Sequence, residues 1–238
     1  MKTQLKIYTL LPLFSFIVFT SCNKSSSNET YKSVKIGDRV WMAENLNVST
    51  FRNGDSIPEV NSADEWIEAS KEKMPAWCYY KNDPENGKKY GKLYNWYAVN
   101  DPRGLAPNGG WYIPSVADWD TLGNYLNEHG KTKFGALPSG NRHVEEHWIK
   151  RGYGTKTESA GPFPGAIRDK VYDMWWDNKE GDWNVGGQYW TSTDMGANAG
   201  SNAHYASSSH NGELTGVGKY IGNGPKRDGR SVRCIKQK

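Results

Sequence analysis

Residues 109–120 join an extended aromatic segment directly to the start of a helix, and this junction constrains the fold more than any other stretch of the chain. The segment reads Gly-Gly-Trp-Tyr-Ile-Pro-Ser-Val-Ala-Asp-Trp-Asp. Pro114 biases Ile113 towards an extended conformation. Ser115 can cap the helix that follows, and Asp118, three residues later, can complete a capping box. We therefore predict a strand that passes into a helix without an intervening loop.

The residues after this junction have the spacing of an amphipathic helix. His129 and Gly130 can end this helix, because a cation is favourable at a helix C-terminus and glycine is the preferred residue just beyond it. The positions that recur at helical spacing are Val116, Trp119, Leu122, Gly123 and Leu126. We expect one helix from residue 116 to residue 129.

The N-terminus has the features of a bacterial export signal. Lys2 and Lys6 lie beside an apolar run over residues 7–19, which is too short to cross a membrane as a stable helix. Cys22 follows small residues and precedes a polar segment, as at a lipoprotein processing site. We predict that residues 1–21 are a signal peptide, that Cys22 is lipidated and that residues 22–30 form a polar tether. The alternative is ordinary signal cleavage that leaves Cys22 as a free thiol.

The rest of the 238-residue chain is long enough for one domain, which we place at residues 31–238. The formal net charge of +4 includes Lys2 and Lys6, so the mature chain is too weakly basic to predict a nucleic-acid partner. We expect a location in the cell envelope, with the protein attached to the outer membrane through its lipid. Both the periplasmic and the surface-facing side stay open, because the residues after Cys22 lack an acidic run.

Two cysteines are left once Cys22 is set aside, and an exported protein lies in an oxidising compartment. We predict a disulfide between Cys78 and Cys234. It would close a loop of more than 150 residues, for which the chain-entropy model gives up to roughly 5 kcal/mol. The alternative is a pair of buried free thiols.

Local patterns predict several elements in the first half of the chain. Residues 31–42 alternate around Gly37-Asp38 and predict a β-hairpin. Ser62 and Glu65 form a capping box that starts a short helix ending before Pro75. Residues 77–80 predict a buried strand, whereas residues 93–99 fit either a strand or a helix, of which we choose the helix.

The composition changes at about residue 150, beyond which Gly, Asn, Ser and Trp dominate. No long helical periodicity is present there, so we expect loops and short strands. The strand candidates are residues 188–193, 204–208 and 231–235, the last closing the domain.

Several separated segments together resemble one family, the Fibrobacter succinogenes major paralogous domain, which occurs in secreted and lipid-anchored proteins of Fibrobacter and Bacteroidetes. Their order and their span over about residues 31–237 make the resemblance specific. The segments are residues 36–37, 40–46, 77–80, 90–99, 110–119, 137–142, 189–193 and 231–234.

The resemblance implies a second, weaker one, because the segment Trp-x-Ile-Pro-Ser followed by a capped helix is similar to part of the C-type-lectin-like superfamily. It implies an α+β, C-type-lectin-like fold with short antiparallel sheets, two main helices, a loop-rich C-terminal half and terminal strands brought together. Neither resemblance supplies an activity, because a fold does not confer one. The segment of residues 143–187 is longer than is usual for the family, so we expect any function that is individual to this protein to lie there.

A possible metal-peptidase motif occurs at residues 143–147. His143, Glu146 and His147 fit the His-x-x-Glu-His spacing, which requires both imidazoles on one helical turn. Nearby Pro138, Gly140, Gly152 and Gly154 argue against a helix, so we expect an exposed polar loop or strand. Hydrolase chemistry is not indicated either, because the sequence contains no Gly-x-Ser-x-Gly motif.

Carboxylates in the irregular region could hold a structural calcium ion, because hard cations prefer clustered oxygens. We expect no other cofactor. The residues are Asp169, Asp173, Asp177 and Asp182.

A cluster of tryptophan, asparagine and aspartate is the strongest candidate for a binding site. Sugar rings stack on tryptophan faces, and their hydroxyls need short polar partners. The alternative is that these tryptophans fill the core, as we expect for Trp41, Trp77, Trp96, Trp111, Trp119 and Trp190. The predicted ligand-binding residues are Trp175, Trp176, Asp177, Asn178, Trp183 and Asn184.

These patterns favour a lipid-anchored binding module of the cell envelope that recognises a glycan or a surface protein without catalysis. The second reading is a structural, adhesin-like component of a surface assembly. The third is a metal-dependent enzyme built on His143, Glu146 and His147.

Overall fold

The computed structural model describes residues 31–129, 134, 139–150, 168–177, 187–196, 201–208 and 221–237 of the 238-residue chain. Of these, residues 144–150, 168–177 and 237 are described by their backbone alone. The predicted signal peptide, the tether and Cys22 lie outside the described residues.

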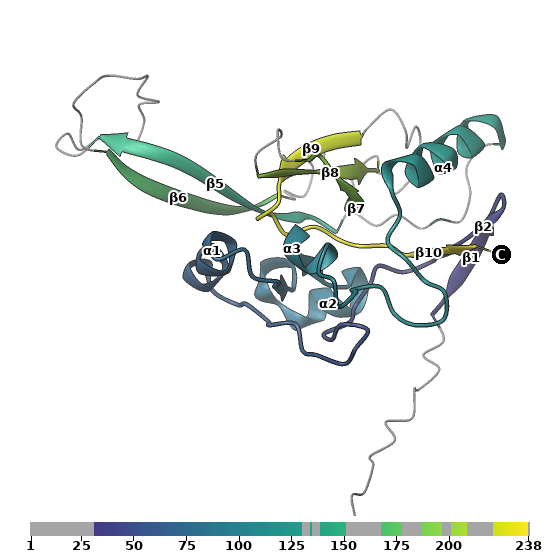
Figure 1. The fold of residues 1–238 in the computed structure, drawn as a ribbon, viewed down its shortest axis with the longest axis horizontal. Helices are drawn as coiled ribbons and strands as arrows, with labels where there is room; N and C mark the ends of the chain where they lie inside the picture. Colours follow the sequence, from purple (N-terminus) through teal and green to yellow (C-terminus); the bar gives the residue numbers. More distant parts are fainter. Residues whose placement is uncertain are drawn as a thin grey trace, which may run out of the picture.

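The fold is α+β, as predicted, with helices and short antiparallel sheets (Figure 1). The helices in the described part are α1 (Ala63–Lys71), α2 (Pro84–Tyr90), α3 (Trp96–Val99) and α4 (Val116–His129), with a short 3-10 helix η1 (Tyr80–Asn82).

Four sheets are formed by the described strands. The first has the order β1 (Ser33–Ile36), β2 (Arg39–Met42), β10 (Ile235–Gln237), and the second pairs β3 (Trp77–Cys78) with β4 (Leu93–Tyr94). The third pairs β5 (Asn141–Lys150) with β6 (Arg168–Asp177), and the fourth has the order β7 (Gln188–Asp194), β8 (Asn202–Ser207), β9 (Ile221–Pro225).

The predicted N-terminal hairpin is confirmed. β1 and β2 pair in antiparallel register, and Gly37 in their turn has a φ of +61°, which glycine adopts without steric cost. β10 pairs with the other edge of β2, with Ile235 opposite Trp41. The two ends of the described chain therefore share one sheet, as the lectin resemblance implied.

Both predicted capping boxes are present. The Asp118 amide donates to Ser115 Oγ at 3.2 Å, and the Ser115 amide donates to Asp118 Oδ2 at 2.9 Å. Ser62 and Glu65 make the same reciprocal pair at α1. The segment before α4 forms no ladder: it joins β10 through the bridge between Tyr112 and Ile235, and the Pro114 carbonyl accepts from the Ser192 amide of β7 at 2.9 Å. The predicted strand is therefore shorter than expected.

The ambiguous stretch 93–99 contains both structures in succession. Leu93 and Tyr94 form β4, and α3 begins at Trp96, so the helix that we predicted is right only for the second half. Asn95 separates the two, because its side-chain oxygen accepts from the Ala98 amide and caps α3.

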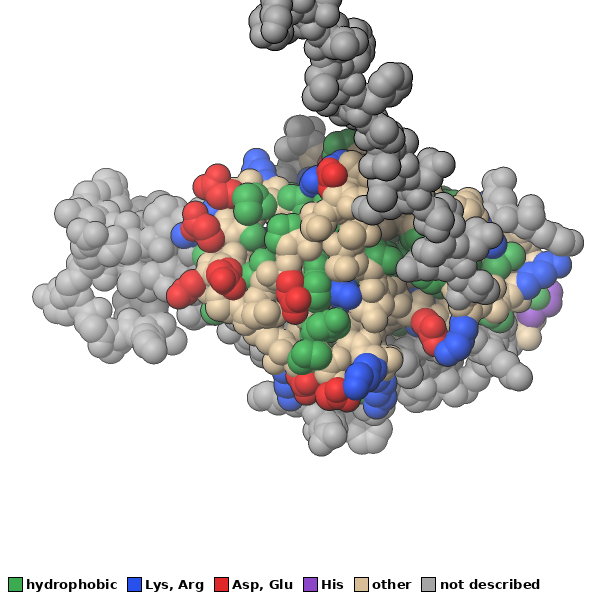
Figure 2. Space-filling view, turned by 90° about the horizontal axis from the view of Figure 1, so that it is seen from below, with side chains coloured by type: hydrophobic (Ala, Val, Ile, Leu, Met, Phe, Trp, Pro, Cys, Tyr) green, Lys and Arg blue, Asp and Glu red, His purple; other side chains and the backbone are tan. Residues whose placement is uncertain are grey.

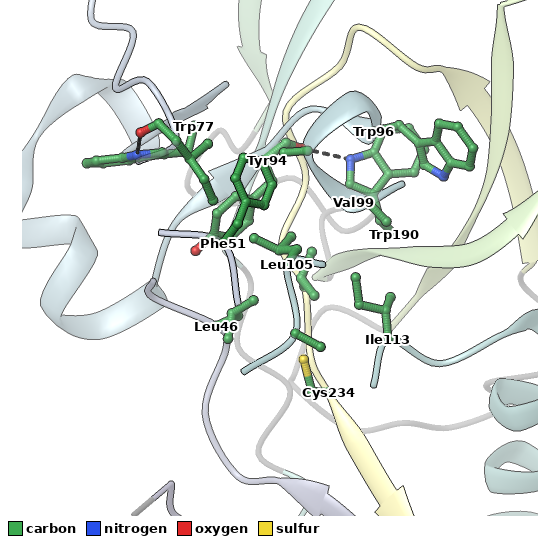
Figure 3. Packing of buried hydrophobic residues seen from close by; sticks show 14 of the residues in the cluster. Leu46, Phe51, Trp77, Tyr94, Trp96, Val99, Leu105, Ile113, Trp190 and Cys234 are labelled. Carbon is green, nitrogen blue, oxygen red and sulfur yellow. Dashed lines mark hydrogen bonds between the residues drawn. The ribbon is translucent and has the colours of Figure 1, made fainter. Parts of the chain in front are cut away.

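The core is rich in aromatic side chains, and all six tryptophans predicted to be buried are buried. Figure 3 shows part of the largest cluster, in which Trp190 lies close to Tyr94. The Trp190 indole donates to the Tyr94 carbonyl at 2.8 Å, and the Trp77 indole donates to the Ile57 carbonyl at 2.8 Å. The indole N–H groups of Trp77 and Trp190 thus have acceptors within the core, which offsets the cost of burying them, whereas that of Trp119 has none among the described residues.

A C-terminal segment, residues 228–235, runs through the middle of the domain and joins its parts through backbone hydrogen bonds. Four carbonyls of this segment accept hydrogen bonds from backbone amides that are distant in the sequence. The bonds are Tyr94 N to Arg230 O (2.9 Å), Trp190 N to Ser231 O (3.0 Å), Leu46 N to Val232 O (2.8 Å) and Met42 N to Cys234 O (2.9 Å).

Arg233 in this segment is buried, with 1% of its surface exposed. Its Nε and Nη2 donate to Asn45 Oδ1 at 3.1 and 2.6 Å, and its Nη1 donates to the Phe134 carbonyl at 2.5 Å. The guanidinium also lies 4.5 Å from the centre of the Phe134 ring. Uncharged oxygens and an aromatic face therefore solvate a charge that water cannot reach.

The predicted disulfide is wrong, because Cys78 and Cys234 are both buried free thiols. The pleat of β3 explains the separation. Trp77 points into the cluster that contains Cys234, and the next residue, Cys78, points to the opposite face, against Trp66 of α1. Burial raises the pKa of Cys78 to about 11 and that of Cys234 to about 12, so both thiols are protonated at neutral pH.

Replacement of Arg233 by Ala should lower the free energy of unfolding by about 3 kcal/mol, because it leaves buried oxygens of Asn45 and Phe134 without donors and opens a cavity. Denaturant unfolding measures the change. Lys35→Ala, at an exposed position of β1, is the control and should leave the unfolding midpoint unchanged. Equal effects of the two substitutions would show that Arg233 does not hold the core together.

Alkylation should not reach Cys78 or Cys234 in the folded protein at mildly alkaline pH, because both thiols are buried and protonated. Denaturant should make both react fully without any reducing agent. Peptide-resolved mass spectrometry separates their signals from that of Cys22. Recovery of a peptide in which Cys78 is disulfide-bonded to Cys234 would contradict the structure.

Candidate functional site

Some of the predicted ligand-binding residues lie in the hairpin formed by β5 and β6. Each strand has ten residues, and the register runs from Asn141 opposite Asp177 to Lys150 opposite Arg168. Figure 1 shows that the hairpin extends away from the rest of the domain. The strand β6 was not predicted, because residues 168–177 lie where loops and short strands were expected.

Three of the six predicted ligand-binding residues lie at the end of β6 nearest the body. Trp175 is opposite His143, Trp176 is opposite Arg142, and Asp177 is opposite Asn141. We call these three pairs the hairpin root. The other predicted residues, Asn178, Trp183 and Asn184, lie outside the described residues.

Arg142 fixes the hairpin root to the body. Its backbone exchanges two hydrogen bonds with Gly229, at 2.9 and 2.7 Å. Its side chain is fully buried, and Nη1 and Nη2 donate to the carbonyls of Val60 and Ser62 at 3.1 and 2.6 Å. The guanidinium lies 4.6 Å from the centre of the Trp66 ring, so Arg142 connects β5 to the start of α1.

His143 lies beside a buried ion pair at the same place. Its Nδ1 is 3.1 Å from Asp228 Oδ2, and the same oxygen accepts from Arg230 Nη2 at 2.9 Å. Asp228 and Arg230 are each 2% exposed at their side chains, whereas His143 is 19% exposed. Arg230 also lies over the rings of Trp190 and Tyr205, at 4.4 and 4.3 Å.

This arrangement makes Asp228 a counter-ion. A histidine beside an aspartate occurs in hydrolase triads, where the aspartate orients the imidazole. Here the same carboxylate oxygen serves Arg230, a buried cation that needs a negative partner. The geometry therefore favours a structural role for Asp228, with His143 as the partly exposed member of the group.

Asn141 is a buried amide at the hairpin root with unused hydrogen-bonding capacity. It is 0% exposed, and neither Nδ2 nor Oδ1 has a partner among the described residues. A buried amide without partners costs free energy, so such a site is where water or a ligand group binds favourably. Sequence reasoning placed Asn141 in the family segment 137–142 but did not single it out as a candidate site residue, because nothing in the sequence shows that its amide is buried.

The metal-peptidase reading does not fit β5. Residues four apart in a strand are separated by about 13 Å, whereas the zinc motif needs both imidazoles on one helical turn. His143 and His147 therefore cannot share an ion in this strand. The expectation that residues 143–147 form a loop or strand is confirmed.

The calcium reading fails for the same reason within β6. Asp169, Asp173 and Asp177 are spaced four residues apart along the strand, so neighbouring positions lie about 13 Å apart. Calcium takes its oxygens at 2.3–2.6 Å, which such positions cannot provide together. Asp182 lies outside the described residues. No cluster of His, Cys, Asp and Glu suited to a metal occurs in the part of the chain that the structure describes.

A separate cavity of about 280 Å³ lies near the start of the described chain. Its two amide residues are already bonded within the protein: Asn45 donates to the Tyr90 carbonyl at 2.9 Å, and Asn47 accepts from Lys92 at 2.9 Å. Sequence reasoning did not find this cavity, because its walls come from the turn-rich segment after β2. The lining residues are Tyr31, Lys32, Met42, Glu44, Asn45, Asn47, Val48, Ser49 and Thr50.

The body itself offers little apolar surface. Figure 2 shows one face, on which hydrophobic side chains are interspersed with charged and polar ones. Met74, at 48%, is the exposed large hydrophobic residue among the described side chains. None of the helices in the described part has both the length and the apolar character that a membrane span needs.

Comparison with known proteins gives one match. The model of the family described as the Fibrobacter succinogenes major domain matches residues 34–236. No curated protein and no solved structure matches the chain significantly. The likeness to the C-type-lectin-like superfamily therefore stays a prediction, whereas the family resemblance seen in the sequence is confirmed.

Replacement of Asp228 by Ala should lower the free energy of unfolding by about 3–5 kcal/mol, because it removes the buried carboxylate that pairs with the Arg230 guanidinium. His143→Ala should cost about 1 kcal/mol, the loss of one partly exposed hydrogen bond. Thermal and denaturant unfolding measure both. Asp38→Ala, which removes an exposed carboxylate, is the control. A His143 effect as large as that of Asp228 would show that the imidazole, rather than Arg230, is the main partner of the carboxylate.

Proposed function

The chain belongs to the Fibrobacter succinogenes major domain family, and we propose that it is a lipid-anchored binding module of the cell envelope that recognises a glycan at the root of the β5–β6 hairpin. The observation that carries the proposal is the position of Trp175 and Trp176 where the projecting hairpin joins the body.

The layout of the molecule suits a module that is anchored at one end and binds at the other. The proposed tether would join the domain at Tyr31, next to β1. In Figure 1, β1 and the hairpin lie at opposite ends of the long axis. A lipid on Cys22 would hold the first end at the membrane, and the hairpin would then point away from it.

The chemistry of the hairpin root suits a sugar. Indole rings bind the C–H faces of pyranose rings, and hydroxyls need amide, carboxylate or imidazole partners. In the ladder, Trp175 and Asp177 lie opposite the partly exposed His143 and the buried Asn141 on one face, whereas Trp176 lies opposite the buried Arg142 on the other face. Arg142 and the Asp228–Arg230 pair hold these backbone positions, which lowers the entropy cost of binding.

A protein partner is the second candidate, in an adhesin-like role. β5 is paired with β6 along its length, and its other edge is bridged to the body at Arg142, near the root. A strand edge that projects from a domain is a template for addition of a strand from another chain. In this case the hairpin edge, rather than its tryptophans, would make the contact.

Glycan binding by the full chain, measured on a glycan array and by affinity electrophoresis, should weaken about three- to tenfold with Trp175→Ala, as expected for the loss of one stacking ring. Trp176→Ala should weaken it less, because Trp176 lies on the face of Arg142. Met74→Ala removes an exposed apolar side chain from the body and should leave binding unchanged. Circular dichroism verifies that each variant is folded.

Absence of glycan binding, or binding that both tryptophan substitutions leave intact, would contradict the proposal. The second candidate would be favoured if the wild-type chain and both tryptophan variants captured the same envelope protein equally well. A variant with Pro substituted in the outer edge of β5 should then fail to capture it.

A further inference from the structure

Lys92, just before β4, is a buried lysine that the proposed binding function does not use. It is 5% exposed. Its ammonium lies 4.3 Å from the centre of the Trp77 ring and 5.2 Å from that of Tyr79. Burial of a lysine is costly unless a carboxylate accompanies it, so the partners of this one are informative.

Both hydrogen-bond acceptors of Lys92 belong to one residue, and both are uncharged. Nζ donates to the backbone carbonyl of Asn47 at 3.0 Å and to Asn47 Oδ1 at 2.9 Å. Burial lowers the pKa of Lys92, although the negative charge of Glu59 acts in the opposite direction. The fraction of neutral amine, which is the nucleophilic form, is therefore larger than for a lysine in water.

We propose that Lys92 and Asn47 are the two ends of an intramolecular amide cross-link between Nζ and Cγ. The Lys92 nitrogen attacks the side-chain carbonyl carbon of Asn47, and the new C–N bond replaces the Cγ–Nδ2 bond. Nζ gives up one proton, which leaves with the amide nitrogen as ammonia. The exchange of one amide for another needs no oxidant, reductant or cofactor.

The hydrogen bond holds Nζ beside the side-chain carbonyl that it would attack. A carbonyl bond is about 1.23 Å long, so an amine 2.9 Å from Oδ1 lies on the order of 3.5 Å from Cγ. Before attack, the hydrogen bond to Oδ1 breaks and the nitrogen lone pair turns to the face of the carbonyl. The two groups are already in contact, so this step costs less entropy than a bimolecular encounter would. The Asn47 amide is further oriented by its Nδ2, which lies 3.5 Å from the Gly87 carbonyl.

Tight packing around Lys92 keeps the two groups together. Gly87 lies directly against the Tyr79 ring, since a Cβ added there would be 2.1 Å from a ring carbon. Tyr79 in turn packs edge-on against Trp77, with 5.1 Å between their ring centres. Asn47 also lines the 280 Å³ cavity, which gives ammonia a way out and makes the reaction irreversible in practice.

The cross-link would join the loop after β2 to the start of β4. This places it in the part of the domain nearest to the proposed tether, where force on an anchored protein enters the fold. A covalent bond at this point keeps the loop attached to β4 when the surrounding hydrogen bonds break.

Peptide mapping of the purified full chain tests the proposal. The digest should contain a branched peptide in which the fragments holding Asn47 and Lys92 are joined, with a mass lower than their sum by one ammonia. Fragmentation should assign the junction to Nζ and Cγ. The branched peptide should be absent from Lys92→Arg and Asn47→Ala and present in Lys88→Arg, which changes an exposed lysine of α2.

Only linear peptides with an intact Asn47 and Lys92 in the folded wild-type protein would overturn the proposal. Conversion of Asn47 to aspartate would overturn it as well, because water rather than Lys92 would then have attacked the amide. The measurement on the wild-type chain is decisive even where a variant fails to fold.

Discussion

The backbone hydrogen bonds of the C-terminal segment, residues 228–235, are the interaction on which the rest of this fold depends. Their donors come from the loop after β2, from β2 itself, from β4 and from β7, and these three strands belong to three different sheets. The sheets have two or three strands each, and sheets this small are marginal by themselves. The last residues of the chain thus assemble the parts, so the core is complete only when contacts of the longest sequence separation have formed.

Arginine and tryptophan share the task of filling the space around this segment. Arg142, Arg230 and Arg233 are each at most 2% exposed, and each lies against an aromatic ring. A guanidinium has several donors in one plane, so it can satisfy backbone carbonyls of irregular segments while its face stacks on a ring. A domain with few regular elements has many such carbonyls, for example those of Val60 and Phe134. Buried arginines therefore replace the hydrogen bonds that helices and sheets supply in more regular folds.

Sequence reasoning found the elements whose cause is local and missed those set by distant contacts. The capping boxes at Ser62 and Ser115 and the Gly37 turn depend on neighbouring residues, and all three are present. The strand β6 was missed because its pairing with β5 spans an intervening segment that sequence patterns cannot bridge. The disulfide prediction failed because it rested on export and cysteine number, whereas the outcome depends on which face of β3 carries Cys78. At the hairpin root, composition pointed to Trp175 and Trp176, but the sequence gives no signal for Asn141 or for the His143–Asp228 contact.

The binding function that we propose would depend on how the core around residues 228–235 holds the projecting hairpin. Positions near the segment 228–235 are constrained by several partners at once, as Asn45 shows by bonding to Tyr90, Ser231 and Arg233. At the other end of this segment, Gly229 and Asp228 bond to Arg142 and His143, so the body holds the root of the hairpin in position. Residues that are already held in position bind a ligand at lower entropic cost. In the proposed binding module, the aromatic and arginine core would therefore serve to position the residues at the root of the hairpin.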